Sequence, residues 1–481
     1  MLDLLLIYPP ISVNQRYGRN VGKIGGLQPP LGLAYLAAYV RDKGFSVKII
    51  DVEASVLNWQ DFVELVKKGN PRVVGIGALT SILARAVDFS QEYRKIAPDV
   101  LIVIGGHHAS IMPEETLRDN ECFDILCKGE GEYALAELLA GYKNTGFDRN
   151  KFLSNFELLK SIPGIVFRKD GQVISNNNPE LIKDLDVLPF PARDLLNMDA
   201  YKPLPNQYKR LPLLNMTISR GCPYECIYCS ANPIFGRRIR MRSADKTVEE
   251  IERLIKDYGA REISFWDDTL TFNKKWLSRF CSLILEKKID ITWTCYSRVD
   301  TVNLEMLRLM KEAGCWNIFF GVESGDQKIL DTIGKGTTIE QIRNACKMCK
   351  QVGIEVRASF MLALPQETPE MAKKTINFAI ELDPDYAQFC ITTPFPRTRL
   401  YEEAKKYGFL DTDFSKYTVW QPIFVPFGYK NREEILKMER LAVRRFYLRP
   451  RYLINKLRKI RSLEDVIRYI KGFRVILGFI K

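Results

Sequence analysis

The sequence predicts an α/β protein: a doubly wound parallel-sheet domain, then a partial (β/α)6 barrel, then a small basic helical region. Short apolar runs alternate with helix-period segments through residues 1–140, and the alternation resumes with a longer period over residues 206–410. Residues 411–481 carry most of the excess positive charge. From Gly428 onward, 16 Lys and Arg stand against 5 Asp and Glu, in a chain of net charge +13.

Apolar, mostly β-branched runs in the first domain predict strands, and the segments between them have the apolar spacing of helices. The predicted strands are Leu4–Tyr8, Val47–Asp51, Val73–Gly77, Leu101–Gly105 and Ile125–Cys127. The predicted helices are Leu31–Lys43, Phe62–Lys68, Leu83–Ile96 and Tyr133–Leu139. Continuous apolar strands separated by helices are typical of a parallel sheet covered on both faces. Such sheets bind ligands at the carboxyl ends of their strands.

Residues 141–205 are predicted to connect this domain to the barrel. They contain a hairpin pattern with Asp170-Gly171 at its turn. The predicted barrel strands are Leu213–Ile218, Glu262–Phe265, Ile291–Tyr296, Asn317–Val322, Glu355–Met361 and Tyr386–Ile391. Six βα units indicate a partial barrel, whose chemistry should lie at the carboxyl ends of the strands.

Capping signals predict where the barrel helices begin. Thr247 with Glu250 and Thr338 with Gln341 have the spacing of capping boxes. Thr368 followed by proline predicts the start of a third helix.

Three cysteines, Cys222, Cys226 and Cys229, lie on one tight segment after the first barrel strand. Three thiolates can bind three irons of a cubane cluster and leave the fourth iron open to a chelating small molecule. A zinc loop is the alternative, but structural zinc needs four closed ligands. The C-x3-C-x2-C spacing, with Tyr228 before the last cysteine, resembles the signature of the radical S-adenosylmethionine (SAM) superfamily. The resemblance implies a [4Fe–4S] cluster and SAM as cofactors.

The same resemblance implies a SAM pocket at the carboxyl ends of the barrel strands. Asp267 and Asp268 match the place that faces the methionine amine, and Glu323 matches the carboxylate that meets the ribose. Arg298 is expected to take the methionine carboxylate as a bidentate fork. For each of these residues, the alternative is a position on the barrel rim with only local hydrogen bonds.

The first domain resembles the cobalamin-binding domain of corrinoid proteins. Ser81-x-Leu83 and Gly105-Gly106 match two of the three pieces of that family's pattern, and Gly129 follows the fifth strand. Glycines at strand ends allow a bulky planar ligand to approach the backbone. The third piece, an Asp-x-His-x-x-Gly loop that supplies a lower axial ligand, is absent from the sequence. The resemblance therefore implies cobalamin bound without histidine ligation, and the alternative is a degenerate domain that only packs.

The chain has two histidines, His107 and His108, which directly follow the Gly-Gly pair. Either could ligate cobalt or donate a proton, but a histidine in such a loop more often makes ordinary hydrogen bonds. We expect neither to ligate cobalt.

Two later segments depart from the radical SAM pattern. Ala363 and Gln366 replace glycines of a Gly-Leu-Pro-Gly-Glu-Thr segment, and Arg397 replaces the glycine of a Pro-x-Pro-Gly-Thr segment. We expect the fold to survive, with changes in the adenine-side backbone and the substrate rim. Cys346 and Cys349 lie one turn apart in a helical pattern and are interpreted as incidental, not as a second cluster site.

Composition bounds the location and the partners. Eleven cysteines without a secretory signal indicate a reducing compartment, so we predict a cytoplasmic protein. No uncharged apolar run reaches the length of a membrane span. The basic tail, with Phe446, Tyr447 and Tyr452 among its cations, fits either a membrane-surface helix or a helix packed on the barrel. No nucleic-acid motif accompanies this charge, so we expect no nucleic-acid partner.

The resemblance to cobalamin-dependent radical SAM enzymes covers about residues 1–410. It implies that the reduced cluster cleaves SAM to a 5′-deoxyadenosyl radical, which abstracts a substrate hydrogen before methylcobalamin delivers a methyl group. Our first prediction is a methyltransferase acting on a poorly activated carbon of a small molecule or lipid, with flavodoxin or ferredoxin as electron donor. The alternatives are an oxidative cyclase with the same cofactors and a non-catalytic corrinoid or iron–sulfur protein.

Overall fold

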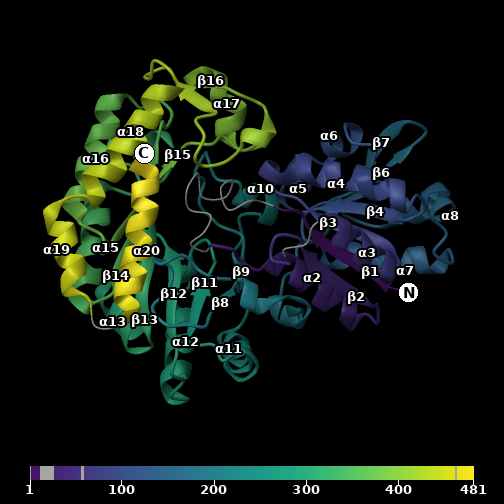
Figure 1. The fold of residues 1–481 in the computed structure, drawn as a ribbon, viewed down its shortest axis with the longest axis horizontal. Helices are drawn as coiled ribbons and strands as arrows, with labels where there is room; N and C mark the ends of the chain where they lie inside the picture. The colour runs from purple at the N-terminus through teal and green to yellow at the C-terminus, as the bar shows by residue number, and fades with distance from the viewer. Residues whose placement is uncertain (1, 11–25, 56–58, 461–462, 481) are drawn as a thin grey trace.

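A computed structural model describes residues 2–10, 26–55, 59–460 and 463–480. Two α/β domains lie side by side, with the amino-terminal strands in one domain and the carboxy-terminal helices on the far side of the other (Figure 1). This arrangement confirms the predicted fold class.

The amino-terminal domain is built on a seven-stranded sheet in the order β2-β1-β3-β4-β5-β6-β7. The strands are β1 (Leu2–Tyr8), β2 (Val47–Asp51), β3 (Pro71–Gly77), β4 (Leu101–Gly105), β5 (Ile125–Cys127), β6 (Ile165–Lys169) and β7 (Gln172–Ser175). Strands β1 to β5 pair in parallel. All the predicted parallel strands are present, and β1 and β3 begin two residues earlier than predicted.

Helices cover both faces of this sheet, as continuous apolar strands require. The helices are α2 (Leu31–Asp42), α3 (Trp59–Gly69), α4 (Leu83–Ile96), α5 (His107–Ile111), α6 (Pro113–Arg118), α7 (Gly131–Asn144), α8 (Arg149–Ser154) and α9 (Phe156–Ser161). Successive β1 side chains point to opposite faces: Leu4 and Leu6 join one buried cluster with α2 and α7, and Leu5 and Ile7 join another with α3 and α4. The sheet is therefore doubly wound.

The predicted hairpin is present as β6 and β7, and it extends the first sheet. Strand β6 pairs antiparallel with β5, where Ile165 lies opposite Cys127. Asp170 and Gly171 at the turn have positive φ angles of 51° and 77°. Positive φ at both central residues is the type I′ geometry, whose twist matches that of the flanking strands.

The second sheet has six parallel strands in chain order and does not close, so β8 and β15 are its two edges. The strands are β8 (Leu213–Met216), β11 (Glu262–Phe265), β12 (Thr292–Ser297), β13 (Cys315–Glu323), β14 (Glu355–Leu362) and β15 (Tyr386–Ile391). Every end lies within two residues of its predicted position. The partial (β/α)6 barrel is thereby confirmed.

Eight helices of the described barrel region lie between or after these strands. They are α10 (Ala231–Phe235), α11 (Ala244–Tyr258), α12 (Lys274–Glu286), α13 (Leu304–Glu312), α14 (Gln327–Thr332), α15 (Ile339–Val352), α16 (Pro369–Leu382) and α17 (Arg399–Tyr407). The predicted capping box of Thr338 and Gln341 is confirmed at the start of α15. Thr368 caps α16 as predicted.

The capping box predicted at Thr247 is wrong. Helix α11 begins at Ala244, where the Ser243 hydroxyl accepts a hydrogen bond from the Lys246 amide. Thr247 lies inside the helix, and so does Glu250, which is buried in a 2.7 Å ion pair with Arg193 of the connector. Glu250 therefore serves a tertiary contact, not the helix terminus.

Three helices and a small hairpin complete the chain: β16 (Gly408–Leu410), β17 (Phe424–Pro426), α18 (Arg432–Tyr447), α19 (Pro450–Arg458) and α20 (Leu463–Ile480). Phe446 and Tyr452 are buried. The Tyr447 hydroxyl donates to the Ala387 carbonyl at 2.6 Å and accepts from the Ala387 amide at 3.1 Å, so α18 covers the open edge of β15. For α18, the barrel-packing alternative therefore describes the aromatic residues of the tail.

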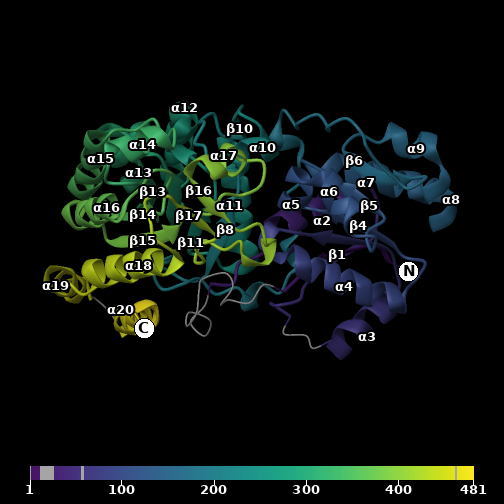
Figure 2. The same ribbon diagram turned by 90° about the horizontal axis from the view of Figure 1, so that it is seen from above.

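Helix α20 lies on the side of the second sheet opposite α12, α13 and α15 (Figure 2). It covers the open side of the partial barrel while keeping several apolar residues exposed, among them Ile470, Phe473 and Leu477. None of the described helices is long and apolar enough to cross a membrane.

Candidate functional site at the facing strand ends

The carboxyl ends of the first sheet lie against the barrel. The His107 ring contacts the ring of Phe235 in α10, with centroids 6.0 Å apart. The Tyr35 hydroxyl donates to the Thr217 carbonyl, just beyond β8, at 2.9 Å. Arg397, beyond β15, pairs with Glu115 of α6 at 3.0 Å. The ligand-binding edges predicted for the two domains therefore meet.

Two buried ion pairs join the domains at this edge. Arg220, next to the cysteine segment, pairs with Glu132 at 2.5 Å, and Arg240 pairs with Glu130 at 2.7 Å. Burial raises the pKa of the Glu130 carboxyl, but the hydrogen bond from the Arg240 guanidinium and the charge of Arg220 lower it, and the pKa is lowered overall. Because both acids follow the Gly129 loop, these pairs fix that loop against the cysteine segment.

The cysteine segment follows β8 and the short strand β9 (Ser219–Arg220), which pairs with β10 (Arg240–Met241). Backbone bonds hold it at both ends: the Cys222 amide donates to Gly236 at 3.2 Å, and the Ile227 amide donates to Ile333 at 3.0 Å. Gly221 has φ +91°, and a side chain there would clash with the backbone of Arg238. The segment is therefore an ordered loop, fixed by backbone hydrogen bonds, and it requires glycine before its first cysteine.

The three cysteines are free thiols, with Cys229 exposed and Cys222 and Cys226 half-buried. Desolvation by the surrounding loop raises the pKa of Cys229 to about 12 even though part of its side chain is exposed, and the nearby Cys226 and Cys222 raise it further. Within the described ranges, no group of three or more His, Cys, Asp or Glu side chains is spaced to hold a single metal ion. Thiolates of a cubane bind different irons, so three cysteines match the donor set of a [4Fe–4S] cluster, whereas structural zinc needs four ligands.

Asp267, directly after β11, is buried and holds the start of the cysteine loop. Its Oδ1 accepts hydrogen bonds from the Ile218 amide at 2.9 Å and from the Ser219 amide and hydroxyl, each at 2.6 Å. Its Oδ2 has no hydrogen-bond partner among the described residues. Burial raises the pKa of Asp267 to about 7. One carboxylate oxygen is thus structural, and the other is buried with its hydrogen-bonding capacity unused among the described residues.

Asp268, the next residue, is exposed at the strand end. Its charge raises the pKa values of the Cys222 and Cys229 thiols, although burial contributes more to both shifts. Asp268 therefore lies beside the cysteine loop and faces outward.

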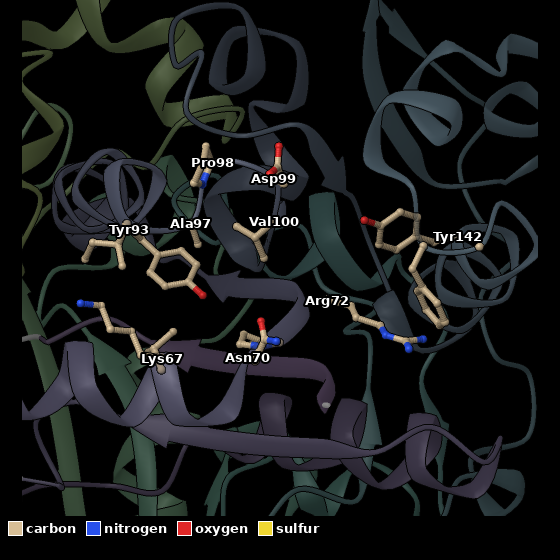
Figure 3. Close-up of a pocket in the computed structure, with 14 residues that line it drawn as sticks. Lys67, Asn70, Arg72, Tyr93, Ala97, Pro98, Asp99, Val100 and Tyr142 are labelled. Atoms are coloured by element: carbon tan, nitrogen blue, oxygen red, sulfur yellow. The ribbon is translucent and has the colours of Figure 1, made fainter.

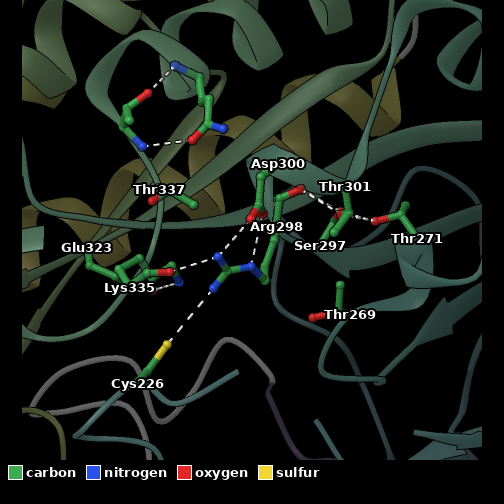
Figure 4. Close-up of polar contacts among 12 residues, drawn as sticks. Cys226, Thr269, Thr271, Ser297, Arg298, Asp300, Thr301, Glu323, Lys335 and Thr337 are labelled. Carbon is green, nitrogen blue, oxygen red and sulfur yellow. Dashed lines mark hydrogen bonds and ion pairs between the residues drawn. The ribbon is translucent and has the colours of Figure 1, made fainter. Parts of the chain in front are cut away.

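Arg298, after β12, lies over the cysteine loop, but its guanidinium group is already hydrogen-bonded to other protein groups (Figure 4). It donates to both oxygens of Asp300 at 2.9 Å and to the Lys335 carbonyl at 2.7 Å. Its remaining Nη1 lies 4.0 Å from Cys226 Sγ, and its guanidinium lies 3.5 Å from the ring centre of Tyr224. The two nitrogens that could bind a carboxylate together, Nε and Nη2, therefore bind Asp300, and only Nη1 points to the cysteine loop.

Glu323, at the end of β13, belongs to a buried polar group with Tyr228 and Lys335. Lys335 Nζ lies 2.7 Å from Glu323 Oε1, and the Tyr228 hydroxyl donates to the same oxygen at 3.1 Å. Burial and the Glu323 charge raise the pKa of Tyr228. Glu323 has φ 67°, a conformation that is strained for a side chain of this size. Lys335 was not predicted as a site residue, although Gly334 and Gly336 on either side of it both have positive φ and mark a turn.

The residues predicted to face cobalamin lie at the carboxyl ends of β3, β4 and β5. Ser81 is half-buried in a short 3₁₀ turn (Thr80–Ile82) that precedes Leu83. Gly106 has φ +93°, and a Cβ there would lie 2.8 Å from the Ala78 nitrogen. The fold itself therefore requires glycine at this position, because the ends of β3 and β4 approach closely. Gly105 and Gly129 lie on the same edge, and the Gly129 amide donates to Ser110 at 2.9 Å.

The two histidines face protein groups. His108 is buried, its Nδ1 lies 3.2 Å from the Thr80 hydroxyl, and its ring contacts Phe414. Burial lowers the pKa of His108 to about 4, and that of His107 is lowered by the same cause. Both are therefore neutral near pH 7, and His108 is engaged in a local hydrogen bond.

The non-glycine residues that depart from the radical SAM pattern keep a glycine-like backbone. Ala363, Gln366 and Arg397 have φ angles of 60°, 63° and 58°. These values lie in the left-handed region that favours glycine. Cys346 and Cys349 are buried in the barrel core.

A cavity of about 630 Å³ lies at the opposite end of the first sheet, near the amino ends of β3 and β4 (Figure 3). It is lined by Arg72, Tyr93 and Tyr142 among others. Because it lies away from the carboxyl ends of the strands, it is separate from the candidate site.

A cysteine loop at the carboxyl edge of a partial (β/α)6 barrel, facing the ligand edge of a doubly wound domain, defines the class of radical SAM enzymes with an attached corrinoid-binding domain. The family models agree with this class. Residues 19–139 match the B12 binding domain, and residues 216–379 match the radical SAM superfamily.

Curated relatives match nearly the whole chain. The uncharacterized methyltransferase PH0819 of Pyrococcus horikoshii is 39% identical over 95% of this chain and 94% of its own length. The anaerobic magnesium-protoporphyrin IX monomethyl ester cyclase of Rubrivivax gelatinosus is 30% identical over 92% of this chain and 78% of its own. The chain belongs to the family of cobalamin-dependent radical SAM enzymes.

Solved structures share the fold. The methyltransferase TsrM of Kitasatospora setae, solved with cobalamin and a [4Fe–4S] cluster, has a TM-score of 0.71 at 16% identity, covering 99% of both chains. OxsB, solved with aqua-cobalamin and SAM, has a TM-score of 0.73 at 18% identity, covering 99% of this chain and 72% of its own. The predicted cofactors, a [4Fe–4S] cluster, SAM and cobalamin, are those of the family.

Proposed function

We propose that this protein is a radical SAM C-methyltransferase that places a methyl group on a poorly activated carbon. The observation that carries the proposal is the meeting of the two ligand edges, where Arg220 and Glu132 hold the cysteine loop against the cobalamin domain. The identity to the Pyrococcus methyltransferase over nearly the full length supports the transferase assignment. When bound, the cofactors supply the electron, the hydrogen-abstracting radical and the methyl group.

The protein's own residues bind and orient. Cys222, Cys226 and Cys229 would hold the cluster, and the open Oδ2 of Asp267 would accept from the methionine ammonium. The Glu323 carboxylate would accept hydrogen bonds from the ribose hydroxyls while it stays paired with Lys335, because a carboxylate oxygen accepts more than one hydrogen bond.

Two predicted site residues take modified roles. Asp268 would act on the outer side of the loop, because it is exposed. Arg298 would use Nη1 near Cys226, and a bidentate grip on the methionine carboxylate would require Asp300 to release its fork.

Cobalamin would lie between the domains, against Ser81, Leu83, Gly105, Gly106 and Gly129. We propose that no protein histidine is its lower ligand, since His108 is engaged by Thr80 at 3.2 Å. Electron paramagnetic resonance of the cob(II)alamin form tests this, because a histidine ligand would add nitrogen hyperfine splitting.

A cyclase is the second candidate, favoured by the 30% identity to the Rubrivivax enzyme. Anaerobically reconstituted protein, given SAM with a deuterated methyl group and a small-molecule extract, separates the two. Label in a product supports methylation, whereas 5′-deoxyadenosine without label transfer supports cyclisation or oxidation. A variant with Ala at all three cysteines is the control and should form neither. Failure of the reconstituted wild type to cleave SAM under reduction would contradict both candidates.

We propose a cytoplasmic location and a flavodoxin or ferredoxin as electron donor. We propose that a peripheral membrane contact would use α20, because Phe446 of α18 and Tyr452 of α19 are buried in the barrel domain. Flotation with anionic vesicles at low salt tests this contact. A truncation after residue 462 should abolish flotation, and unbound full-length protein would contradict the proposal.

A further inference from the structure

A second cavity, of about 810 Å³, lies between α20 and the barrel, in the size range of small-molecule sites. Its walls come from Arg357 of β14, residues 386–389 of β15, Trp420, helices α18, α19 and α20, and residues 204–207 of the connector. Arg468 of α20 donates to the Tyr208 carbonyl at 2.8 Å, which closes one side. The cavity therefore lies on the β14–β15 side of the barrel, whereas the cysteine loop follows β8 at the opposite edge of the sheet.

The lining is mostly aliphatic and aromatic, and its charge is entirely positive. Arg357, Lys456, Arg468 and Arg474 line the cavity, and no Asp or Glu does so among the described lining residues. Ile470, Phe473 and Leu477 also line it while remaining exposed, so they form an apolar rim. An apolar cavity with cations and no acid is complementary to an anion with an apolar body.

Arg357 is the residue that most strongly indicates an anion-binding site. It is 7% exposed, lines the cavity and has no hydrogen bond or ion pair with any described residue. Its nearest recorded partner is the ring of Phe319, whose centre lies 4.5 Å from the guanidinium. A buried guanidinium is normally paired, because an uncompensated charge is costly to remove from water.

Lys456 adds a second cation to the same lining, with its Nζ buried. Its Nζ lies 3.7 Å from the ring centre of Tyr386 and 5.4 Å from that of Tyr452, and it has no hydrogen-bond partner among the described residues. Tyr386 lies opposite Arg357 in the strand register, so the residues that carry or contact the two cations are neighbours in the sheet. The nearby acids Glu355 and Asp385 are paired with Lys459.

We infer that this cavity binds an amphiphilic anion, with its apolar body against α20 and one carboxylate or phosphate head at Arg357 and Lys456. The ligand would neutralise the buried guanidinium and fix α20 across the open side of the barrel. The site is distinct from the cysteine-loop site, because its lining includes none of the three cluster cysteines and neither Asp267, Arg298 nor Glu323.

The test measures binding of three probes that share one chain: laurate, dodecyl phosphate and dodecanol, each below its micelle concentration. By calorimetry on the full chain, we expect one equivalent of either anion to bind at least tenfold more tightly than the alcohol. Tight binding of laurate alone identifies a carboxylate head, and of dodecyl phosphate alone a phosphate head. Equal binding of the alcohol would overturn the inference, because the cations would then have no role.

Substitutions assign the roles within the cavity. Arg357→Met should weaken both anions at least tenfold, leave dodecanol unchanged and raise the melting temperature of ligand-free protein, because it removes an uncompensated buried charge. Arg343→Met is the matched control, since Arg343 is exposed and paired with Glu381. Phe473→Asp, at the exposed rim, should weaken all three probes and keeps the test valid if Arg357→Met fails to fold. Unchanged anion binding in Arg357→Met, or loss of SAM binding in that variant, would contradict the inference.

Discussion

Replacement of Asp267 tests how the barrel holds its cysteine loop. In Asp267→Ala, the amides of Ile218 and Ser219 lose the acceptor they share, and so does the Ser219 hydroxyl. A buried donor left without a partner costs about 1–3 kcal/mol, so the loss of three bonds should cost about 3–5 kcal/mol. Asp267→Asn keeps an acceptor oxygen at Oδ1 and should cost about 1 kcal/mol or less.

The cost of Asp267→Ala should depend on pH. The folded-state pKa of Asp267 is raised from 3.8 to about 7. A raised carboxyl pKa means that its contribution to folding is fully present below the unfolded pKa and is lost as pH rises to 7. At about 1.36 kcal/mol per unit, the wild type loses on the order of 2–3 kcal/mol between pH 5 and pH 7, and the Ala variant does not. The stability difference between the two proteins should therefore be larger at pH 5 than at pH 8.

Urea unfolding of the cofactor-free protein at these two pH values, followed by tryptophan fluorescence, measures both effects. Iron content after anaerobic reconstitution supplies a second readout, and it should fall in Asp267→Ala but not in Asp267→Asn. Equal stability differences at the two pH values, together with full iron in the Ala variant, would refute the reasoning about this carboxylate.

Three further changes follow from the structure. Lys335→Met breaks a buried ion pair with Glu323 and should destabilise the protein by about 3–5 kcal/mol in thermal unfolding, whereas a loss below 1 kcal/mol would show that the pair is solvated. Ala363→Gly and Gln366→Gly should each stabilise by up to about 1 kcal/mol, because both residues have positive φ, and any destabilisation would contradict the strain argument. Glu439→Gln should raise stability at pH 8 but not at pH 5, because burial raises the pKa of Glu439 to about 7, and a pH-independent change would exclude that cause.

Local signals were sufficient to predict the two sheets. Apolar runs such as Leu101–Gly105 and Ile125–Cys127 have the predicted bounds because strands buried on both faces need continuous apolar sequence. The cysteine loop was equally accessible, since its spacing lies within eight residues of sequence. Its position next to the first domain follows from one rule, that parallel sheets bind ligands at the carboxyl ends of their strands.

Partner choice within the site could not be predicted. Glu323 pairs with Lys335, and the Arg298 guanidinium forms a bidentate ion pair with Asp300. Glu132 pairs with Arg220, which lies 88 residues away in the sequence. Each pairing depends on how helices and loops pack around a strand end, which carries no periodic signal in the sequence. The first-domain glycines show the same limit: Gly106 looked like a ligand contact, but close approach of Ala78 already requires it.

The tail is connected to the site through a buried carboxyl. Glu367 Oε1 accepts from the Ala363 amide at 2.8 Å and from the Tyr429 hydroxyl at 2.5 Å. This bond closes the turn in which Ala363 and Gln366 take the left-handed conformation that glycine would adopt without strain. Tyr429 therefore helps to impose the backbone at the end of β14. A truncation before Tyr429 would remove that support, so an experiment on the tail alone has to spare α18 and delete only α20.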